Sequence, residues 1–234
     1  MSRLDDLQRF YSLLLALEER LAGARRLANC NGRVSWPKRG VYFFMEPGET
    51  RSHSGRGPRI VRVGTHALKA GSGTKLWNRL AQHRGVARSG GGNHRGSIFR
   101  LIVGTALRER DAIDCDSWDD RRGTAPPEVR ERELPLERAV SQVIRNMPFL
   151  WLSVDDEPGP QSLRGFIERN AIALLSNYGK PPIDPPSDSW LGSYCTREKV
   201  RTSGLWNSNH VDESYDPAFL DTLASPVERV EQPE

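Results

Sequence analysis

The chain of 234 residues contains few cysteines, few lysines and no long apolar run. Cys30, Cys115 and Cys195 are odd in number and far apart, with no CxxC pair or Cys/His cluster, which excludes a disulfide framework and a structural zinc module. No stretch approaches the roughly 18 apolar residues of a membrane span, and the start MSRLDDLQRF, with Asp5 and Asp6 before its apolar stretch, is unlike a secretory signal. We therefore expect a cytoplasmic protein without a membrane partner.

The charges of the chain are unevenly distributed, and only five of its 34 basic residues are lysines. Residues 1–100 hold 19 Lys and Arg against 6 Asp and Glu, whereas residues 101–234 are net acidic. Because guanidinium groups bind phosphate oxygens in pairs, the basic part is typical of a protein that binds nucleic acid. Docking of the acidic part on the basic part explains the same asymmetry equally well.

Hydrophobic periodicity predicts helices on both sides of a small set of strands. The leucines of residues 4–28 predict a helix that packs on the core or pairs with a second subunit. GVYFFM at 40–45 and RIVRVG at 59–64 predict two strands joined by a polar hairpin loop. A helix follows over 73–84, and FLWLSVDD at 149–156 predicts a further strand.

The second part of the chain contains further predicted helices. Ser97 is expected to cap one of them, although Ile102 and Val103 also suit a strand. Residues 115–133 are charged and contain prolines, which predicts a surface excursion before a helix that carries Pro135 in its first turn. A largely buried helix begins after Ser162, and Asp216 is expected to cap a short C-terminal helix, PAFLDTL.

The helix LWNRLAQHRG places two polar side chains beside its own buried stripe. At 100° per residue, Arg79 and His83 fall only about 60° and 20° from the direction of Leu76. Such a pair usually extends from the rim of a core into water. On the first strand, alternation directs Tyr42 away from its neighbours and towards the opposite face.

Four segments, in this order, resemble the motifs of the GIY-YIG nuclease superfamily. They are GVYFF at 40–44, VRVGT at 61–65, LWNRLAQHRG at 76–85 and GFIERNAIALL at 165–175. Each motif alone is weak, but four in the family's order and in suitable strand and helix contexts are considerably stronger. The resemblance covers about residues 38–178 and leaves an insertion near 98–147.

The resemblance implies an α/β (α+β) fold with about three strands flanked by helices. The division that follows is an N-terminal helical extension over 1–35, a nuclease core over 36–180 and a C-terminal extension over 181–234. The implied activity is metal-dependent hydrolysis of DNA phosphodiester bonds, with a restriction or defence role by family analogy. Repair or mobile-element processing is the alternative role, and RNA is not excluded as substrate. The N-terminal helix or the extensions offer surfaces for a homodimer.

The resemblance also implies roles for four residues. Glu168 would bind Mg²⁺ or Mn²⁺, since these ions accept carboxylate oxygens and take further ligands from substrate phosphate. Arg79 would hold the scissile phosphate. Tyr42, whose phenol has a reference pKa of about 10, needs nearby positive charge to act as a base, and His83 is the natural relay or direct base.

The second motif departs from the family, because Arg62 stands where the family usually has a tyrosine. Arginine stays protonated and cannot act as a base, so Arg62 is expected to bind a phosphate oxygen or to have ended catalysis, leaving a DNA-binding module. A set of polar residues near the motifs is expected to contact nucleic acid along with it: His66, Lys75, Arg84, Asn93, Arg95 and Asn177.

Overall fold

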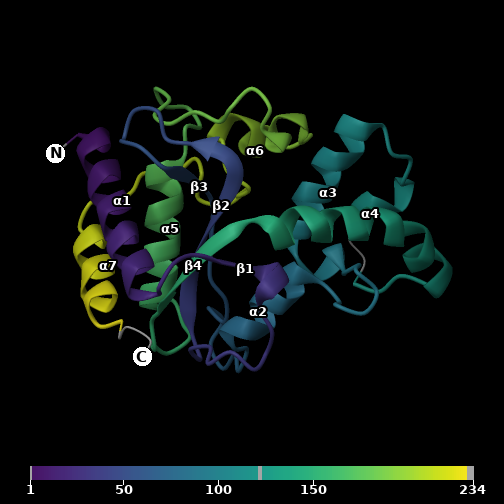
Figure 1. The fold of residues 1–234 in the computed structure, drawn as a ribbon, viewed down its shortest axis with the longest axis horizontal. Helices are drawn as coiled ribbons and strands as arrows, with labels where there is room; N and C mark the ends of the chain where they lie inside the picture. The colour runs from purple at the N-terminus through teal and green to yellow at the C-terminus, as the bar shows by residue number, and fades with distance from the viewer. Residues whose placement is uncertain (1, 121–122, 231–234) are drawn as a thin grey trace.

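The computed structural model describes residues 2–120 and 123–230, which form an antiparallel sheet with helices on both faces (Figure 1). Within these residues the sheet has four strands in the order β1-β4-β2-β3. The strands are β1 (Arg25–Arg26), β2 (Gly40–Thr50), β3 (Pro58–Gly64) and β4 (Pro148–Ser153). The expected mixed fold with about three strands is confirmed, and the additional strand, β1, has only two residues.

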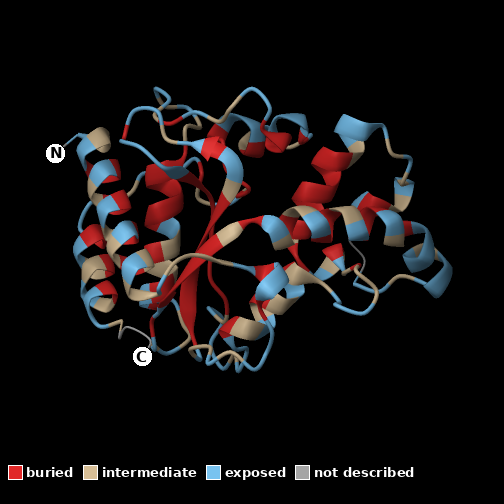
Figure 2. Cartoon of the chain, viewed as in Figure 1, coloured by how far each residue is buried: buried red, intermediate tan, exposed pale blue. Residues whose placement is uncertain are grey.

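The two faces of the sheet support two separate cores, which appear as the red interior of Figure 2. Val41 and Phe43 point towards α1 (Arg3–Arg20), α5 (Leu163–Leu175) and α7 (Phe219–Glu228). Tyr42 and Phe44 point towards the opposite core, which includes residues of α2 (Leu76–Arg84), α3 (Ile98–Asp111) and α4 (Pro127–Asn146). The predicted orientation of Tyr42 away from its two neighbours is therefore confirmed.

A bulge in β3 determines which face Arg62 occupies. In the pairing of β2 with β3, Phe44 lies opposite Arg62 and Met45 lies opposite Ile60, so that Val61 is an extra residue. Both Val61 and Arg62 consequently face the core that contains Tyr42, where the Arg62 guanidinium lies over the Phe99 ring. Simple alternation along the strand does not reveal this orientation.

The N-terminal helix is shorter than its leucine pattern predicts. It ends at Arg20, because Ala22 and Gly23 adopt positive φ angles of 54° and 102° that no α-helix accommodates. The prediction of helix up to residue 28 is wrong, since residues 25–26 pair with β4. The apolar residues of α1 pack in the core of their own chain and against α7, so this helix does not need a second subunit to cover it.

The prediction for residues 115–133 is wrong in two respects. Trp118 is fully buried, and α4 already begins at Pro127, where a proline loses no hydrogen bond. Pro135 therefore lies inside the helix and not in its first turn. Leu136 and Val140 of α4 belong to the core that α3 also lines, and this packing stabilises the helix across its internal proline. Residues 121 and 122 of the predicted excursion lie outside the described residues.

Other boundaries agree with the predictions or extend them. Ser97 caps α3 and Ser162 caps α5, in each case by accepting a backbone N–H three residues later, as expected. The predicted hairpin loop is shorter than expected because β2 continues to Thr50. The prediction for Asp216 is the exception and is wrong: Ala218 is at the cap position of α7 without a side-chain cap, and the Asp216 side chain accepts the N–H of Ala218 before the helix begins.

The C-terminal part of the chain returns to the sheet. It contains α6 (Glu198–Ser203), and the segment after α6 runs beside β3, where the N–H of Trp206 donates to the carbonyl of Val61 at 2.7 Å. Short 3₁₀ turns occur at Leu27–Asn29, His94–Gly96, Asp116–Asp119 and Leu191–Tyr194. Among the described residues, no helix has the length and apolar character needed to cross a membrane.

Candidate active site

Tyr42 lies against a glycine that leaves room for its ring. Gly64 is directly opposite Tyr42 in the β2–β3 pairing. A Cβ atom on Gly64 would lie 2.4 Å from the Tyr42 hydroxyl oxygen and 2.5 Å from the ring carbon that bears it. The glycine of the second motif is therefore required by the close approach of this phenol.

His83 binds Tyr42 inside the protein. Its Nε2 lies 2.8 Å from the Tyr42 hydroxyl, and its Nδ1 lies 2.9 Å from the hydroxyl of Ser97. The imidazole is fully buried. Burial lowers the pKa of His83 well below 6.5, and the nearby charges of Arg79, Arg62 and Arg100 lower it further. At neutral pH His83 is therefore an uncharged hydrogen-bonding partner of Tyr42.

A buried ion pair holds the backbone of the histidine helix. Arg100 donates to the carbonyl of His83 at 2.8 Å and to Glu137 Oε2 through Nε at 3.0 Å. Glu137 Oε1 in turn accepts from the backbone N–H and lies 3.0 Å from the imidazole Nδ1 of His94. Burial alone raises the pKa of Glu137, but His94 and Arg100 outweigh it, so its net pKa is lowered. The pair therefore fixes α2, α3 and α4 around His83.

Arg62 places a buried charge on the Tyr42 face of the sheet. Its guanidinium lies 4.7 Å from the centre of the Phe99 ring and donates to the Trp206 carbonyl, and its Nε has no hydrogen-bond partner among the described residues. Burial lowers the pKa of Arg62, whereas the neighbouring Tyr42 and Glu168 raise it. The Arg62 cation therefore interacts electrostatically with both the phenol and the carboxylate.

Arg79 lies at the rim of the site and is half-buried. Its guanidinium donates to Gln82 Oε1 at 3.1 Å and to the Gly96 carbonyl at 3.2 Å. Neither acceptor is charged, so the positive charge of Arg79 is not neutralised by these contacts. Its influence on the pKa of both His83 and Glu168 places it near the two motifs.

Glu168 reaches the end of β3 from the opposite face of the sheet. Its Oε1 accepts the backbone N–H of Thr65 at 3.1 Å, while Oε2 has no hydrogen-bond partner within the described part of the chain. Burial raises the pKa of Glu168, and the charges of Arg62, His210 and Arg79 partly oppose this effect. The site thus offers one carboxylate oxygen that is not engaged by the protein.

This arrangement fits a hard divalent cation held by one protein ligand. No group of three or more His, Cys, Asp or Glu side chains suited to a metal ion occurs in residues 2–120 and 123–230. Mg²⁺ nevertheless needs only one or two carboxylates, because it retains water and takes other ligands from phosphate. Glu168, with its unengaged oxygen, is the residue that would hold such an ion.

The other predicted contact residues are dispersed. His66 follows Thr65 and is buried, and burial lowers its pKa to about 4. Lys75 is exposed at the start of α2, and Arg84 lies over Trp77 and donates to the Cys30 carbonyl at 2.5 Å. Among these three side chains, only that of Lys75 extends freely into solvent.

Asn93, Arg95 and Asn177 bind other parts of the protein. Asn93 accepts the N–H of Arg95 at 3.1 Å, and Arg95 binds Glu133 through two nitrogens at 2.6 and 2.7 Å. The Asn177 side chain accepts from Arg3 at 2.9 Å and from the N–H of Ile183 at 3.0 Å. Asn177 lies nine residues beyond Glu168, which separates them by more than two helical turns. These three residues lie outside the arrangement around Tyr42.

The structure adds C-terminal residues to this region. The Asn207 side chain accepts from the N–H of Val63 at 3.2 Å and donates to its carbonyl at 2.9 Å, which satisfies the open edge of β3. His210 has a positive φ of 64° and lies near enough to Glu168 to oppose the rise in its pKa. The polar and aromatic composition of GLWNSNHV is unusual for a chain terminus, but the sequence does not reveal that this segment packs along β3.

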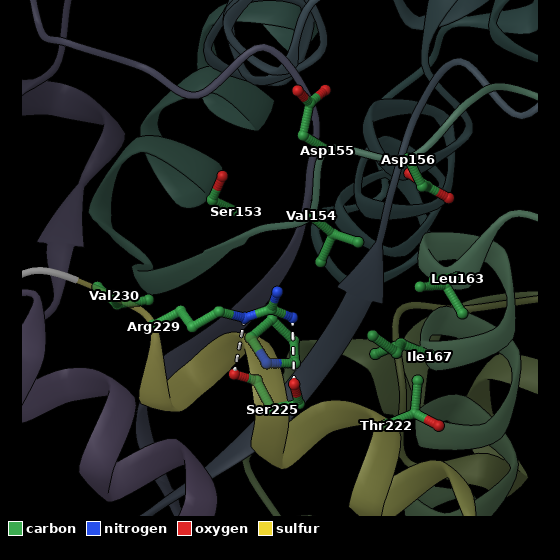
Figure 3. A pocket seen from close by; sticks show the side chains of 11 residues that line it. Ser153, Val154, Asp155, Asp156, Leu163, Ile167, Thr222, Ser225, Arg229 and Val230 are labelled. Carbon is green, nitrogen blue, oxygen red and sulfur yellow. Dashed lines mark hydrogen bonds between the residues drawn. The ribbon is translucent and has the colours of Figure 1, made fainter.

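A cavity of about 630 Å³ lies elsewhere, between the end of β4, α5 and α7 (Figure 3). Arg229 crosses it and donates to the carbonyl and the hydroxyl of Ser225. Leu163 and Ile167 of α5 line this cavity, but Glu168 does not. None of the residues expected to be catalytic borders it, so it is separate from the candidate active site.

The arrangement of Tyr42, Gly64, His83, Arg79 and Glu168 agrees with a comparison of the whole chain with protein families. The family model of the GIY-YIG domain matches residues 1–233. The chain therefore belongs to the GIY-YIG family, a family of nucleases. The match also takes in α1 and α7, which lie outside the four motifs. No curated protein and no solved structure matches the chain.

Proposed function

We propose that this protein is a metal-dependent endonuclease that cuts DNA between the Tyr42–His83 pair and Glu168. The observation that carries the proposal is the 2.8 Å contact of Tyr42 with His83 on one side and the unengaged oxygen of Glu168 on the other. The charge of Arg62 acts on both sides of this site. Hydrolysis of a phosphodiester needs a group that accepts a proton from water, and it needs positive charge beside the phosphate.

The residues divide the chemical work between them. Tyr42 accepts the proton that the attacking water loses as its oxygen bonds to phosphorus, and passes its own phenolic proton to His83 Nε2, 2.8 Å away. Arg79, whose charge is not neutralised by its present contacts, binds a non-bridging oxygen of the phosphate. Glu168 would hold Mg²⁺ or Mn²⁺, which would supply positive charge beside the phosphate. The leaving oxygen takes a proton from solvent.

Three exposed lysines extend the positive surface beyond the site. Lys38 precedes β2, whereas Lys69 and Lys75 lie in the connection from β3 to α2. The Lys38 carbonyl accepts the N–H of Leu76 at 3.0 Å, which joins the two segments. None of the three lysines forms an ion pair with another described residue, so their charges are available to a DNA backbone.

A restriction or other defence role is the biological setting that we propose, on the ground of family analogy. The main alternative is a DNA-binding module without activity. The observation that favours the alternative is that Arg62 occupies the position of the second-motif tyrosine and is buried against Phe99. Cleavage distinguishes the two functions, because only a nuclease cuts the DNA it binds.

The first experiment is cleavage of supercoiled, branched and single-stranded DNA with Mg²⁺, Mn²⁺ or EDTA. We expect cutting that depends on a divalent cation, and the preferred substrate separates a defence role from a repair role. Single-stranded RNA of the same sequence is included as a competing substrate. DNA binding without cutting of any substrate would replace the endonuclease with the binding module, and would implicate Arg62.

A further inference from the structure

Two arginines of α4 face a cavity that is separate from the candidate active site. Arg138 and Arg145 are seven positions apart, so they project from the same face of this helix. Both line a cavity of about 960 Å³ between α4, the end of α3 and β2. Gln142 and Asn146 of α4 add polar side chains to its wall. No residue placed in the candidate active site borders this cavity.

Each of the two arginines uses part of its guanidinium to hold the loop that follows α2. Arg138 Nε donates to the Ser89 carbonyl at 2.9 Å. Arg145 donates through Nε to the Arg84 carbonyl at 2.8 Å and through Nη2 to the Val86 carbonyl at 3.0 Å. An arginine carries five N–H donors. Both side chains are therefore fixed in position while several of their donors remain for another molecule.

The charges of these two arginines are not neutralised by the protein. Neither Arg138 nor Arg145 forms an ion pair within the described part of the chain, since their acceptors are backbone carbonyls. Glu137, the neighbour of Arg138 in the chain, binds the buried Arg100. Burial lowers the pKa of Arg145, and the charges of Arg84 and Arg100 lower it further. Arg145 therefore lies among cations and has no carboxylate partner.

The carboxylates that line the same cavity are bound to other groups. Asp111 accepts from Arg110 through both oxygens, at 2.7 and 2.8 Å. Glu46 Oε2 accepts the indole N–H groups of Trp190 and Trp206 at 3.0 and 2.8 Å. A cavity in which cations lack counter-ions attracts anions from solution. The two α4 arginines are thus the groups of this cavity that are free to bind an anion.

The spacing of the two guanidinium groups suits a backbone with repeated phosphates. Guanidinium forks bind phosphate oxygens in pairs. Seven residues of an α-helix span about 10 Å, which is the length of about three base-pair steps of duplex DNA. A single backbone that runs along α4 therefore meets both Arg138 and Arg145.

The phosphates bound at α4 differ from the phosphate that is cut. Arg79 and Arg84 are five positions apart on α2, which separates them by about 140° around the helix. Arg79 belongs to the candidate active site, whereas the Arg84 carbonyl is bound by Arg145. The two α4 arginines therefore lie on another side of α2 from the scissile phosphate. DNA reaches them only where it extends beyond the cleavage position.

We propose that Arg138 and Arg145 form a second DNA site, which binds the phosphate backbone beyond the scissile phosphate. This inference rests on the proposed function for the identity of its partner. It gives a role to α4, which lies in the insertion between the third and fourth motifs. The site holds the substrate and takes no part in the reaction.

Fluorescence anisotropy of a 40-base-pair duplex over a salt series tests the proposal, with EDTA present so that the DNA stays uncut. Arg138→Ala should reduce the slope of log affinity against log salt by about 0.9, as for one lost phosphate contact. Arg132→Ala removes the same charge from an exposed position on another face of α4, and should leave the slope unchanged. Equal slopes for wild type and Arg138→Ala would overturn the proposal.

Arg145 needs a second variant, because its side chain also holds the loop after α2. Arg145→Ala should reduce the slope by about 0.9, whereas Arg145→Lys keeps the charge and should keep the slope. Urea titration of both variants shows whether they are folded. A folded Arg145→Ala protein with the wild-type slope would remove Arg145 from the DNA site.

Two further measurements separate the proposal from its alternatives. Calorimetric titration with inorganic phosphate tests for a site that takes a free anion: phosphate binding that Arg138→Ala abolishes, together with a wild-type slope for DNA, would overturn the DNA site. Cleavage assays separate it from the proposed function. Reduced slopes without cutting would retain the α4 site and remove the endonuclease, whereas cutting with unchanged slopes would do the reverse.

Discussion

The two sides of the candidate active site are built in opposite ways. On the α2 side, Tyr42, His83 and the Arg100–Glu137 pair are buried and satisfy one another through short contacts. On the α5 side, Glu168 makes one hydrogen bond to the backbone, and its pKa is raised by burial. A buried carboxylate with a raised pKa costs folding free energy. The first side is held by buried mutual contacts, whereas the second side leaves one Glu168 oxygen without a hydrogen-bond partner among the described residues.

The largest expected effect on stability is at Glu137, which supports the α2 side. Glu137→Ala leaves the Arg100 charge buried without its partner and should lower the free energy of unfolding by about 3–5 kcal/mol. Glu131→Ala, an exposed change on the same helix, is the control and should have little effect. Urea titration of both proteins checks this, and equal losses would show that the buried pair does not support the fold.

The largest expected effect on activity without loss of stability is at Glu168. Glu168→Ala should reduce cleavage by about 10³-fold, because several kcal/mol of stabilisation by the cation are lost. The free energy of unfolding should stay equal or rise, since a half-buried carboxylate whose pKa is raised by desolvation is removed. Single-turnover cleavage and urea titration test both statements. Arg169→Ala, an exposed change at the next position of α5, should retain cleavage.

Tyr42→Phe should affect both activity and stability, unlike the change at Glu168. Cleavage should fall by about 10²-fold when the phenolic oxygen is absent. His83 loses its buried partner at 2.8 Å, which should lower the free energy of unfolding by about 1–3 kcal/mol. Tyr194→Phe, a change at an exposed tyrosine, is the control. Undiminished cleavage by Tyr42→Phe would remove the phenol from the mechanism.

The α2 side should also respond to pH through His83. Its folded-state pKa lies well below 6.5, so below pH 6.5 the unfolded chain binds a proton that the folded protein does not bind. The free energy of unfolding should therefore have its full value above pH 6.5. Below pH 6.5 it should decrease by up to about 1.4 kcal/mol per pH unit. His83→Gln should flatten the profile from pH 7 to pH 5 relative to wild type, whereas the exposed change His53→Gln should not.

The smallest expected effect is on DNA binding, at Lys75, which belongs to neither the α2 side nor the α5 side of the site. Lys75→Ala should weaken duplex binding modestly and reduce the slope of log affinity against log salt by about 0.9, as for one lost phosphate contact. Lys199→Ala is the control and should leave the slope unchanged, because the Lys199 charge is already paired with Asp212 at 2.7 Å. Fluorescence anisotropy over a salt series measures both slopes, and an unchanged slope would place Lys75 outside the DNA interface.

Local sequence signals predicted the elements that carry their own pattern. The strand with Tyr42, the helix with Arg79 and His83, and the caps Ser97 and Ser162 follow from alternation, helical spacing and capping preference. The start of α4 escaped prediction, because its prolines and charges resemble a loop. Packing of its apolar side against α3 outweighs that local preference.

The candidate site could be predicted only in part, because many of its contacts join elements that are far apart in the sequence. Tyr42, His83 and Glu168 are found from motif order, but the contacts of Arg95 with Glu133 and of Asn177 with Arg3 join residues far apart in the chain. Arg100 also gave no sequence signal, since a buried arginine on an apolar helix has no visible partner until Glu137 is placed beside it. Their partners depend on how the helices pack.

The sequence by itself determined the alternation that sends Tyr42 to one face of β2 and the helical spacing that sets Arg79 and His83 near a buried stripe. These features depend on neighbouring residues and on fixed backbone geometry. Only the tertiary structure decided that the bulge at Val61 turns Arg62 towards Tyr42, that Ser97 meets His83, and that Glu168 arrives from the opposite face. Such contacts join separate elements, so they exist only once both cores have packed against the sheet.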